Sequence, residues 1–236
     1  MHFLDIKQLL ITDNDKKLVD IDFKINSSTA LIGQSGSGKS LTIKSLLDML
    51  PSNLSSKIDI DANFELKKEN IGFVPQNPFT SLSPLTKIGK QFLLNNKTLD
   101  EKRKIELLEL VGLDSSLLNR FPMELSGGQL QRVVIAMAIS SNPKILLLDE
   151  PTTALDTDSK KNILTLLNKL KKELNLLILF VTHDIKSIED ITDEIVIIKN
   201  GQVIEKGFTK ELLINPKEQY TKDLISSGFN NRKYRC

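Results

Sequence analysis

The chain has 236 residues, 40% of them hydrophobic, and its 32 basic and 30 acidic residues give a formal net charge of +2 at pH 7. A chain of this length can bury a sizeable core, while the interspersed charges exclude the strong basic field of proteins that bind nucleic acid or anionic membranes. The single cysteine, Cys236, excludes a disulfide within the chain and a cysteine-based metal cluster, as suits a reducing cytosol.

No segment is suited to crossing a membrane. The longest apolar runs, such as 176–181, are far shorter than the roughly 20 residues that a spanning helix needs. The N-terminal residues lack the basic start and apolar centre of a secretory signal. We therefore expect a chain that folds by itself and does not cross a membrane, with the basic tail 232–235 exposed to solvent.

The first part of the chain predicts two paired strands, a buried strand and a helix. Strands are expected over 3–11 and 18–25, joined by a polar turn, because apolar and polar residues alternate in the second of them. The apolar run 29–32 predicts a short strand, and a helical pattern begins at Leu41.

Between this strand and this helix lies a match to the phosphate loop G-x-x-x-x-G-K-[ST]. In such a loop backbone N–H groups surround a phosphate, Lys39 reaches its outer oxygens and the Ser40 hydroxyl ligates Mg²⁺. The pattern arises by chance in a chain of this length with a probability on the order of one in a hundred. A Gly/Ser-rich linker is the alternative, but a linker does not pass directly from a buried strand into an amphipathic helix. The loop consists of Gly33, Gln34, Ser35, Gly36, Ser37, Gly38, Lys39 and Ser40.

The middle of the chain changes character. Apolar residues alternate over 58–66, and a short strand is expected over 71–74, ending at Pro75. Helical spacing then appears over 101–111, and a nearly all-apolar helix over 130–139 is entered through a Ser-Gly-Gly segment. We therefore predict a mostly helical lobe over about 77–140.

The last part predicts strands that alternate with helices. The continuous apolar run 145–148 is typical of a central parallel strand, and further elements are a helix over 157–174 and a buried strand over 177–181. This order predicts an α/β fold with a parallel sheet and right-handed crossovers. Asn200-Gly201, between two short strands, predicts a type I′ hairpin.

Polar side chains follow three of the predicted strands. Because ligands in parallel α/β sheets lie beyond the carboxyl ends of the strands, we expect the phosphate loop, Asp149, Glu150 and His183 at one edge. Asp149 suits the outer coordination of a Mg²⁺ shared with Ser40, and Glu150 suits orienting a water. An acidic pair after a strand is often only a helix cap or a solvated turn, but the segment 151–156 that follows favours a function.

Together these motifs resemble the ATP-binding cassette (ABC) ATPase family, from residue 3 to about 225. The resemblance implies a P-loop NTPase cassette: one ABC ATPase domain over 1–236 with a parallel sheet core, an antiparallel β subdomain, the helical lobe about 77–140 and a short C-terminal extension about 208–236. ATP and Mg²⁺ are the implied cofactors.

The resemblance also implies roles for individual residues. Gln76 matches the glutamine that contacts Mg²⁺ and the attacking water and relays site occupancy to membrane subunits. Without the resemblance, a single glutamine at this place is typical of a polar loop. Asp156 matches an aspartate that crosses the dimer interface. His183 matches the switch histidine, the alternative being a structural histidine capped by Asp184. The Ser-Gly-Gly helix start matches the family's signature, which faces the γ-phosphate held by the other subunit; by itself it is typical of an ordinary N-cap. The signature consists of Ser126, Gly127, Gly128 and Gln129.

Within the family, segments 76–84, 121–124 and 215–221 resemble ATPases of oligopeptide, dipeptide and nickel importers. That implies a peripheral subunit on the cytoplasmic face of the cell membrane that hydrolyses ATP to energise import. Its implied partners are a second ABC ATPase subunit, identical or related, two integral membrane permease subunits and, indirectly, an extracytoplasmic solute-binding protein, with no nucleic acid. The choice between peptide and nickel stays open, because the cassette does not touch the cargo.

Two other classes of protein are alternatives to this interpretation. A soluble ABC ATPase that acts on nucleic acid or ribosomes needs a long coiled-coil insertion, a second cassette or a basic groove. A nucleotide-gated binding module with an inactive site is disfavoured by the presence of both Glu150 and His183. One departure from the family concerns adenine: residues 11–13 stand where an aromatic residue usually stacks on the base.

Overall fold

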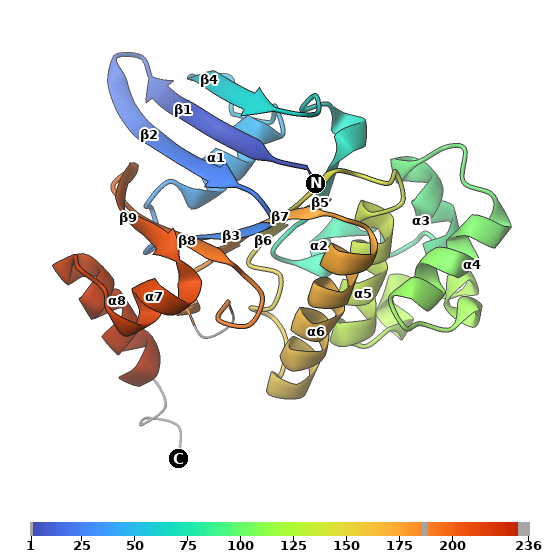
Figure 1. Ribbon diagram of the computed structural model, residues 1–236. Coiled ribbons are helices and arrows are strands. Elements are labelled where there is room, and N and C mark those ends of the chain that lie inside the picture. The colour runs from blue at the N-terminus through green and yellow to red at the C-terminus, as the bar shows by residue number, and fades with distance from the viewer. Residues whose placement is uncertain (1, 186–187, 231–236) are drawn as a thin grey trace. The chain divides into compact units, whose positions relative to one another are not determined.

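The computed structural model describes residues 2–185 and 188–230, and these form two compact units (Figure 1). The first unit combines residues 1–65 with 177–236, and the second unit spans residues 66–176. The expected basic tail 232–235 and Cys236 lie outside the described residues.

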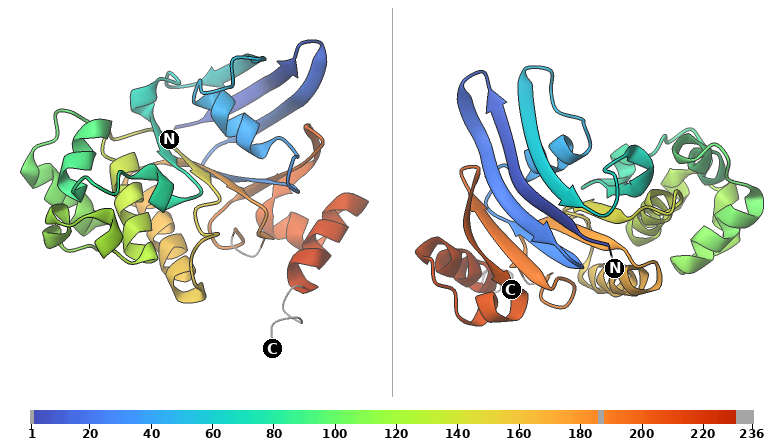
Figure 2. Two further views of the ribbon diagram at one scale, coloured as in Figure 1. Left: turned by 180° about the vertical axis from the view of Figure 1, so that it is seen from behind. Right: turned by 45° about the horizontal axis from the view of Figure 1, so that its top comes forward.

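A sheet in the order β4-β1-β2-β9-β8-β3-β7 forms the first unit. In this sheet β3 pairs in parallel with β7 on one side and with β8 on the other, while β1 pairs antiparallel with β2 and β4. The right-hand view of Figure 2 shows this antiparallel part as the blue and cyan ribbons. The strands are β1 (Leu4–Asp13), β2 (Lys16–Ile25), β3 (Ser28–Ile32), β4 (Leu54–Ala62), β7 (Leu177–Thr182), β8 (Glu194–Lys199) and β9 (Gln202–Phe208).

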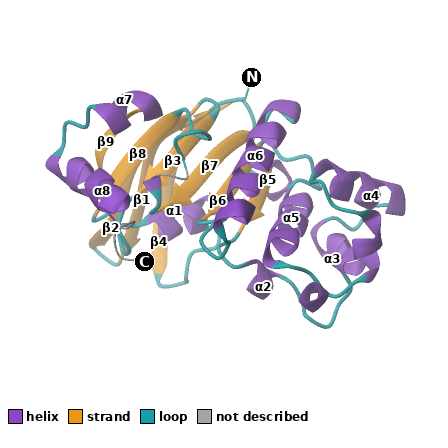
Figure 3. Cartoon of the chain, turned by 90° about the horizontal axis from the view of Figure 1, so that it is seen from below, coloured by secondary structure: helices purple, strands orange, loops and turns teal. Residues whose placement is uncertain are grey.

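Burial follows the predicted patterns in this unit except at its edge. Every residue of β3 and β7 is buried, as the continuous apolar runs predict. The alternation over 58–66 predicts a strand there, but β4 begins earlier, at Leu54, and ends at Ala62, and it pairs with β1. Ile60 is therefore 36% exposed. The helices are α1 (Lys39–Leu46), α7 (Thr209–Ile214) and α8 (Gln219–Asn230), of which α7 and α8 lie beside β8 and β9 (Figure 3).

Two parallel strands and a group of helices form the second unit. β5 (Ile71–Val74) pairs residue for residue with β6 (Ile145–Asp149). The apolar faces of α4 and α5 bury Leu107, Leu108, Val133 and Ile135 completely. The helical segments are η1 (Lys68–Asn70), α2 (Pro78–Ser81), α3 (Ile88–Asn95), α4 (Glu101–Leu110), η2 (Ser115–Asn119), η3 (Pro122–Glu124), α5 (Gly127–Ala138) and α6 (Thr157–Glu173).

The strands and helices confirm the predicted α/β class, with an antiparallel part beside parallel pairs. Asn200 and Gly201 adopt φ values of 49° and 75°, the left-handed pair that a type I′ turn requires. Within the described part of the chain, no helix has both the length and the apolar character needed to cross a bilayer.

Candidate functional site

The phosphate loop of the first unit closes around the ammonium group of Lys39. Lys39 is 7% exposed, and its Nζ donates to the carbonyl oxygens of Gly33 at 2.6 Å and Gln34 at 3.0 Å. The Ser37 N–H also donates to the Gln34 carbonyl oxygen at 3.2 Å. A buried cation is thus held on backbone oxygens, at the place where the motif predicts contact with phosphate.

Helix α1 begins without a side-chain cap. Its N-cap is Gly38, whose φ of 107° is a conformation that L side chains rarely adopt, and a Cβ there would lie 2.7 Å from Cγ2 of Val19. The first N–H groups of an α-helix have no partner within the helix. Lys39, Ser40 and Leu41 therefore present N–H groups at the positive end of the helix dipole, which favours an anion.

The β8–β9 turn supports the loop from its outer side. Gly201 N donates to the Ser37 carbonyl oxygen at 3.0 Å, and Asp20 N donates to the Gly201 carbonyl oxygen at 2.7 Å. A Cβ on Gly33 would lie 2.3 Å from the carbonyl oxygen of Ile198. Glycine is needed at position 33 because the neighbouring strand approaches so closely.

His183 stands at the same sheet edge as the loop. The parallel register pairs Ile32 with Thr182, so the chain leaves β3 at Gly33 and β7 at His183 side by side. His183 is exposed, and Asp184 N donates to Thr182 Oγ1 at 3.0 Å. Two of the predicted groups are thus neighbours by strand register.

The second unit brings Gln76 and Glu150 together. The register of β5 and β6 pairs Val74 with Leu148, and the two residues follow on neighbouring strands. Gln76 Nε2 donates to Glu150 Oε2 at 3.1 Å, and Thr153 Oγ1 donates to the same oxygen at 3.1 Å. The remaining carboxylate oxygen makes neither of these bonds.

Glu150 also has an unusual backbone. Its φ of 47° is left-handed, which is uncommon for a residue other than glycine and costs of order 1–3 kcal/mol. Asp149 is the last residue of β6 and is partly exposed. Sequence reasoning missed Thr153, although its place in the segment 151–156 is a signal that singles it out.

The signature forms the start of α5, with Ser126 as N-cap. Ser126 Oγ accepts from Gln129 N at 3.3 Å, and Gln129 Oε1 accepts from Ser126 N at 3.0 Å, which makes a capping box. A Cβ on Gly128 would lie 3.1 Å from Ser159 Oγ, and one on Gly127 would contact Leu155. The signature therefore packs closely against the start of α6.

Asp156 is the N-cap of that neighbouring helix. Its carboxylate accepts from Ser159 N at 2.9 Å. This backbone N–H, together with the Ser159 hydroxyl, lowers the pKa of Asp156 below its ordinary value of 3.8. Asp156 and the signature, which the sequence separates by about thirty positions, lie together in the second unit.

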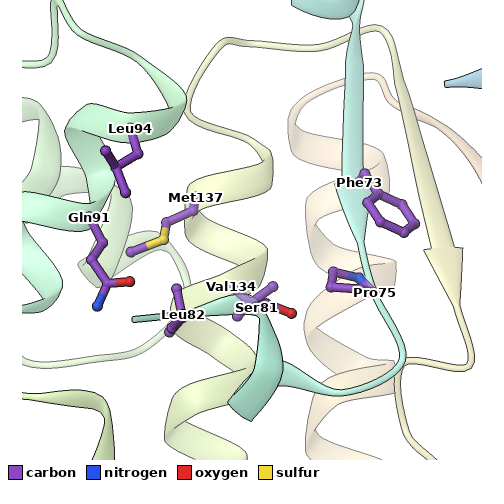
Figure 4. Close-up of a pocket in the computed structure, with 8 residues that line it drawn as sticks. All are labelled: Phe73, Pro75, Ser81, Leu82, Gln91, Leu94, Val134 and Met137. Carbon is purple, nitrogen blue, oxygen red and sulfur yellow. The ribbon is translucent and has the colours of Figure 1, made fainter. Parts of the chain in front are cut away.

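An apolar pocket opens beside the strand that leads to Gln76. Figure 4 shows its lining side chains, which come from β5, α2, α3 and α5. The buried amide of Gln91 shapes one rim, because it bonds to Ser83 N at 2.8 Å and to the carbonyl oxygens of Ser83 and Thr86 at 3.1 and 2.6 Å. Sequence reasoning did not identify this pocket, since its residues are spread over the lobe: Phe73, Pro75, Ser81, Leu82, Gln91, Leu94, Val134 and Met137.

Comparison with known proteins agrees with these features. Residues 17–153 match the family described as ABC transporter. The chain is 38% identical to the oligopeptide transport ATP-binding protein OppD of Bacillus subtilis over 84% of this chain, but it spans only 62% of the length of that relative. It is 36% identical to the metal-staphylopine import system ATP-binding protein CntD of Staphylococcus aureus, over 96% of this chain and 93% of CntD.

Among solved structures, CbiO1 from Clostridium perfringens, part of the ABC transporter complex CbiONQ, matches with a TM-score of 0.76 and 29% identity. The match covers 90% of each chain. It confirms the cassette fold that the motifs predicted. The matched regions contain the phosphate loop, the signature and the acidic residues at the end of β6. The chain belongs to the ABC transporter family, and within this family it resembles the ATP-binding proteins of peptide and metal import systems.

Proposed function

We propose that this chain is the ATP-binding and ATP-hydrolysing subunit that energises an ABC importer, organised as one ABC ATPase domain with its helical lobe and short C-terminal extension. The observation that carries the proposal is the phosphate loop, in which buried Lys39 lies beside the uncapped start of α1. A cation together with the N–H groups at the start of a helix in one loop fits a triphosphate. The similarity to OppD and CntD supports import over a soluble role on nucleic acid or ribosomes.

The loop residues Gly33–Ser40 bind the phosphates in this proposal. Lys39 exchanges its bonds to the loop carbonyl oxygens for phosphate oxygens. Ser40, Gln76 and Asp149 are the residues that would hold Mg²⁺, since hydroxyl, amide and carboxylate oxygens suit this cation. The bound Mg²⁺ supplies charge neutralisation on the phosphates.

Glu150 is the proposed general base. A water molecule attacks the γ-phosphorus, the bond to the ADP oxygen breaks, and the Glu150 carboxylate accepts the proton of the water. Donors from Gln76 and Thr153 hold the Glu150 carboxylate in place through its Oε2. His183, at the end of β7, is proposed to contact the γ-phosphate from its neighbouring strand.

The Glu150→Gln variant tests this assignment. We expect ATP binding to persist while turnover falls by about 10²- to 10⁴-fold, because an amide keeps the shape of the side chain but cannot accept the proton. The measurement is phosphate release at saturating MgATP together with nucleotide affinity. Glu109→Gln, which neutralises an exposed carboxylate on α4, is the matched control and keeps wild-type turnover. A turnover within a few-fold of wild type in Glu150→Gln would show that another group is the base.

A second cassette and the membrane subunits are the proposed partners. Ser126, Gly127, Gly128, Gln129 and Asp156 close over ATP held by the facing subunit, which is a second copy or a related chain. The apolar pocket beside Pro75 suits a segment of a permease subunit, since its apolar lining leads directly to Gln76. This assembly holds the chain at the cytoplasmic face of the cell membrane.

Dimer formation is measured by analytical ultracentrifugation of Glu150→Gln with and without MgATP. A dimer that forms only with nucleotide supports self-association, whereas a monomer that pairs only with another cassette identifies a related partner. A chain that pairs with no cassette in either condition contradicts the proposed assembly.

Peptide and metal remain the two proposed cargo classes, because OppD and CntD are named for one each. Uptake of labelled oligopeptides and of labelled nickel in cells that lack this subunit separates them. Loss of one uptake identifies the cargo, and normal uptake of both contradicts the importer proposal.

A further inference from the structure

Tyr220, in the first turn of α8, contacts the phosphate loop although no motif of the family marks it as a nucleotide residue. Its hydroxyl accepts a hydrogen bond from Gln34 N at 3.2 Å. Residues 34 and 220 lie 186 positions apart in sequence. The contact joins the C-terminal helix to the loop that the proposed function assigns to phosphate.

This bond holds one end of a peptide unit whose other end is held by Lys39. Gln34 N and the Gly33 carbonyl oxygen belong to the same peptide, and no peptide bond in the described chain is cis. A trans peptide directs its N–H and C=O in opposite directions. The oxygen therefore faces Lys39 Nζ at 2.6 Å, while the N–H faces Tyr220 on the outside of the loop.

Nucleotide binding affects the two hydrogen bonds of this peptide differently. When phosphate oxygens draw the Lys39 ammonium away from the loop carbonyls, the Gly33 oxygen loses its charged partner. The bond from Gln34 N to Tyr220 then keeps the orientation of the peptide. A loop that is already in its phosphate-binding shape binds more tightly, since less ordering accompanies binding.

Tyr220 is itself fixed in place by its surroundings. Glu205 on β9 accepts from Lys217 N at 2.9 Å and from Glu218 N at 3.2 Å, which anchors the residues just before α8. The ammonium of Lys199 lies 4.6 Å from the centroid of the Tyr220 ring, a cation–π geometry. Leu224 of α8 is buried, at 8% exposure, and α8 lies against β9 (Figure 3).

We propose that Tyr220 is a positioning residue of the nucleotide site, which holds the Gly33–Gln34 peptide of the phosphate loop and so raises the affinity for the phosphates of a nucleotide. The inference rests on the proposed nucleotide-binding function. Tyr220 acts through the loop backbone, so it sets affinity and leaves the chemical step to the residues of the second unit.

The test is the Tyr220→Phe variant of the full chain, which removes only the hydroxyl. Calorimetric titration with Mg²⁺ and a non-hydrolysable ATP analogue gives the affinity, and phosphate release gives KM and kcat. We expect affinity to fall and KM to rise about two- to tenfold, the range for one neutral hydrogen bond, with kcat unchanged. The matched control is Ser226→Ala, which removes a hydroxyl whose bond stays within α8 and leaves affinity unchanged.

Three results overturn the proposal. Equal or tighter binding by Tyr220→Phe shows that the bond does not position the loop. A loss of kcat together with a lower unfolding temperature of the nucleotide-free chain shows a structural role. An equal loss of affinity in Ser226→Ala and Tyr220→Phe shows that the hydroxyl of Tyr220 has no specific role. If the wild-type chain binds no nucleotide, the proposed function fails instead, which is a distinct outcome.

Discussion

Helices α1 and α5 begin in opposite ways. α1 starts at Gly38 with no side-chain cap, whereas α5 starts at Ser126 with a complete capping box. Orphan N–H groups at a helix start need an acceptor. In α5 side chains supply acceptors, since the Ser126 hydroxyl accepts from the Gln129 N–H and the Gln129 side-chain oxygen accepts from the Ser126 N–H. In α1 no side chain caps the helix start.

This difference separates a site that a ligand completes from a site that is formed beforehand. The start of α1 has no side-chain cap, so phosphate oxygens that bind at the positive end of its dipole stabilise it. At the start of α5 the capping box already satisfies the N–H groups of Ser126 and Gln129, and the Ser126 hydroxyl that accepts from Gln129 N can still donate its own proton. A preformed signature suits a surface that meets a ligand already bound elsewhere.

The largest effect is expected from Lys39→Ala at the uncapped start. A hydrogen bond to a charged group contributes about 1.5–3 kcal/mol, so nucleotide affinity should fall about 10- to 100-fold. Lys44→Ala, an exposed lysine of the same helix, is the control and retains wild-type affinity. Calorimetric titration with MgATP measures both. Equal affinity in Lys39→Ala and wild type would remove the loop from the nucleotide site.

A ligand-protection experiment compares the two helix starts within one chain. At about 100 times the dissociation constant of MgATP, the loop and the start of α1 should gain about 2.7 kcal/mol of protection against hydrogen exchange. The amides of Gly128 and Gln129 should gain none in the monomer. Exchange of peptides covering 33–41 and 126–130 is the measurement. Equal protection of both regions would erase the distinction between them.

A smaller effect is expected when the cap of α5 is removed. Ser126→Ala leaves Gln129 N without its acceptor and should lower the free energy of unfolding by about 0.5–2 kcal/mol, the usual cost of losing an N-cap. Binding of MgATP by the isolated chain should stay unchanged, because the loop does not involve this cap. Urea unfolding and titration give the two numbers. Ser115→Ala, a partly exposed serine of the same unit, is the control.

The smallest effect concerns the charged cap of α6 beside the signature. The pKa of Asp156 is lowered in the folded chain by the Ser159 N–H and hydroxyl. Its charge therefore stabilises the fold above the ordinary value of 3.8, and this contribution is lost as pH falls through the lower folded value. Asp156→Asn keeps a capping oxygen but cannot titrate.

We accordingly expect wild type to exceed Asp156→Asn in stability near neutral pH, and the difference to narrow as pH falls below about 4. Urea unfolding across this pH range measures it. A difference that does not change with pH would mean that the Asp156 charge adds nothing to the cap.

The local sequence determined much of the fold and each contiguous segment of the candidate site. Continuous apolar runs predicted the buried strands β3 and β7, and Asn200-Gly201 predicted the β8–β9 turn, because burial and positive φ constrain residue choice strongly. The phosphate loop and the signature were likewise visible, since each is one contiguous segment. The exact end of β4 was not predicted, because an edge strand pairs with one neighbour and its apolar pattern constrains the position of its end less.

Tertiary structure decided the contacts between segments that are distant in sequence. The bond of Gln76 to Glu150, the packing of Gly128 on Ser159 and the bond between Gln34 and Tyr220 each join segments whose own patterns say nothing about a partner. The physical reason is that periodicity and turn chemistry are local properties, whereas a long-range hydrogen bond depends on strand register and helix packing together. The sequence by itself thus determined which chemical groups this chain carries, and the fold decided which of them meet.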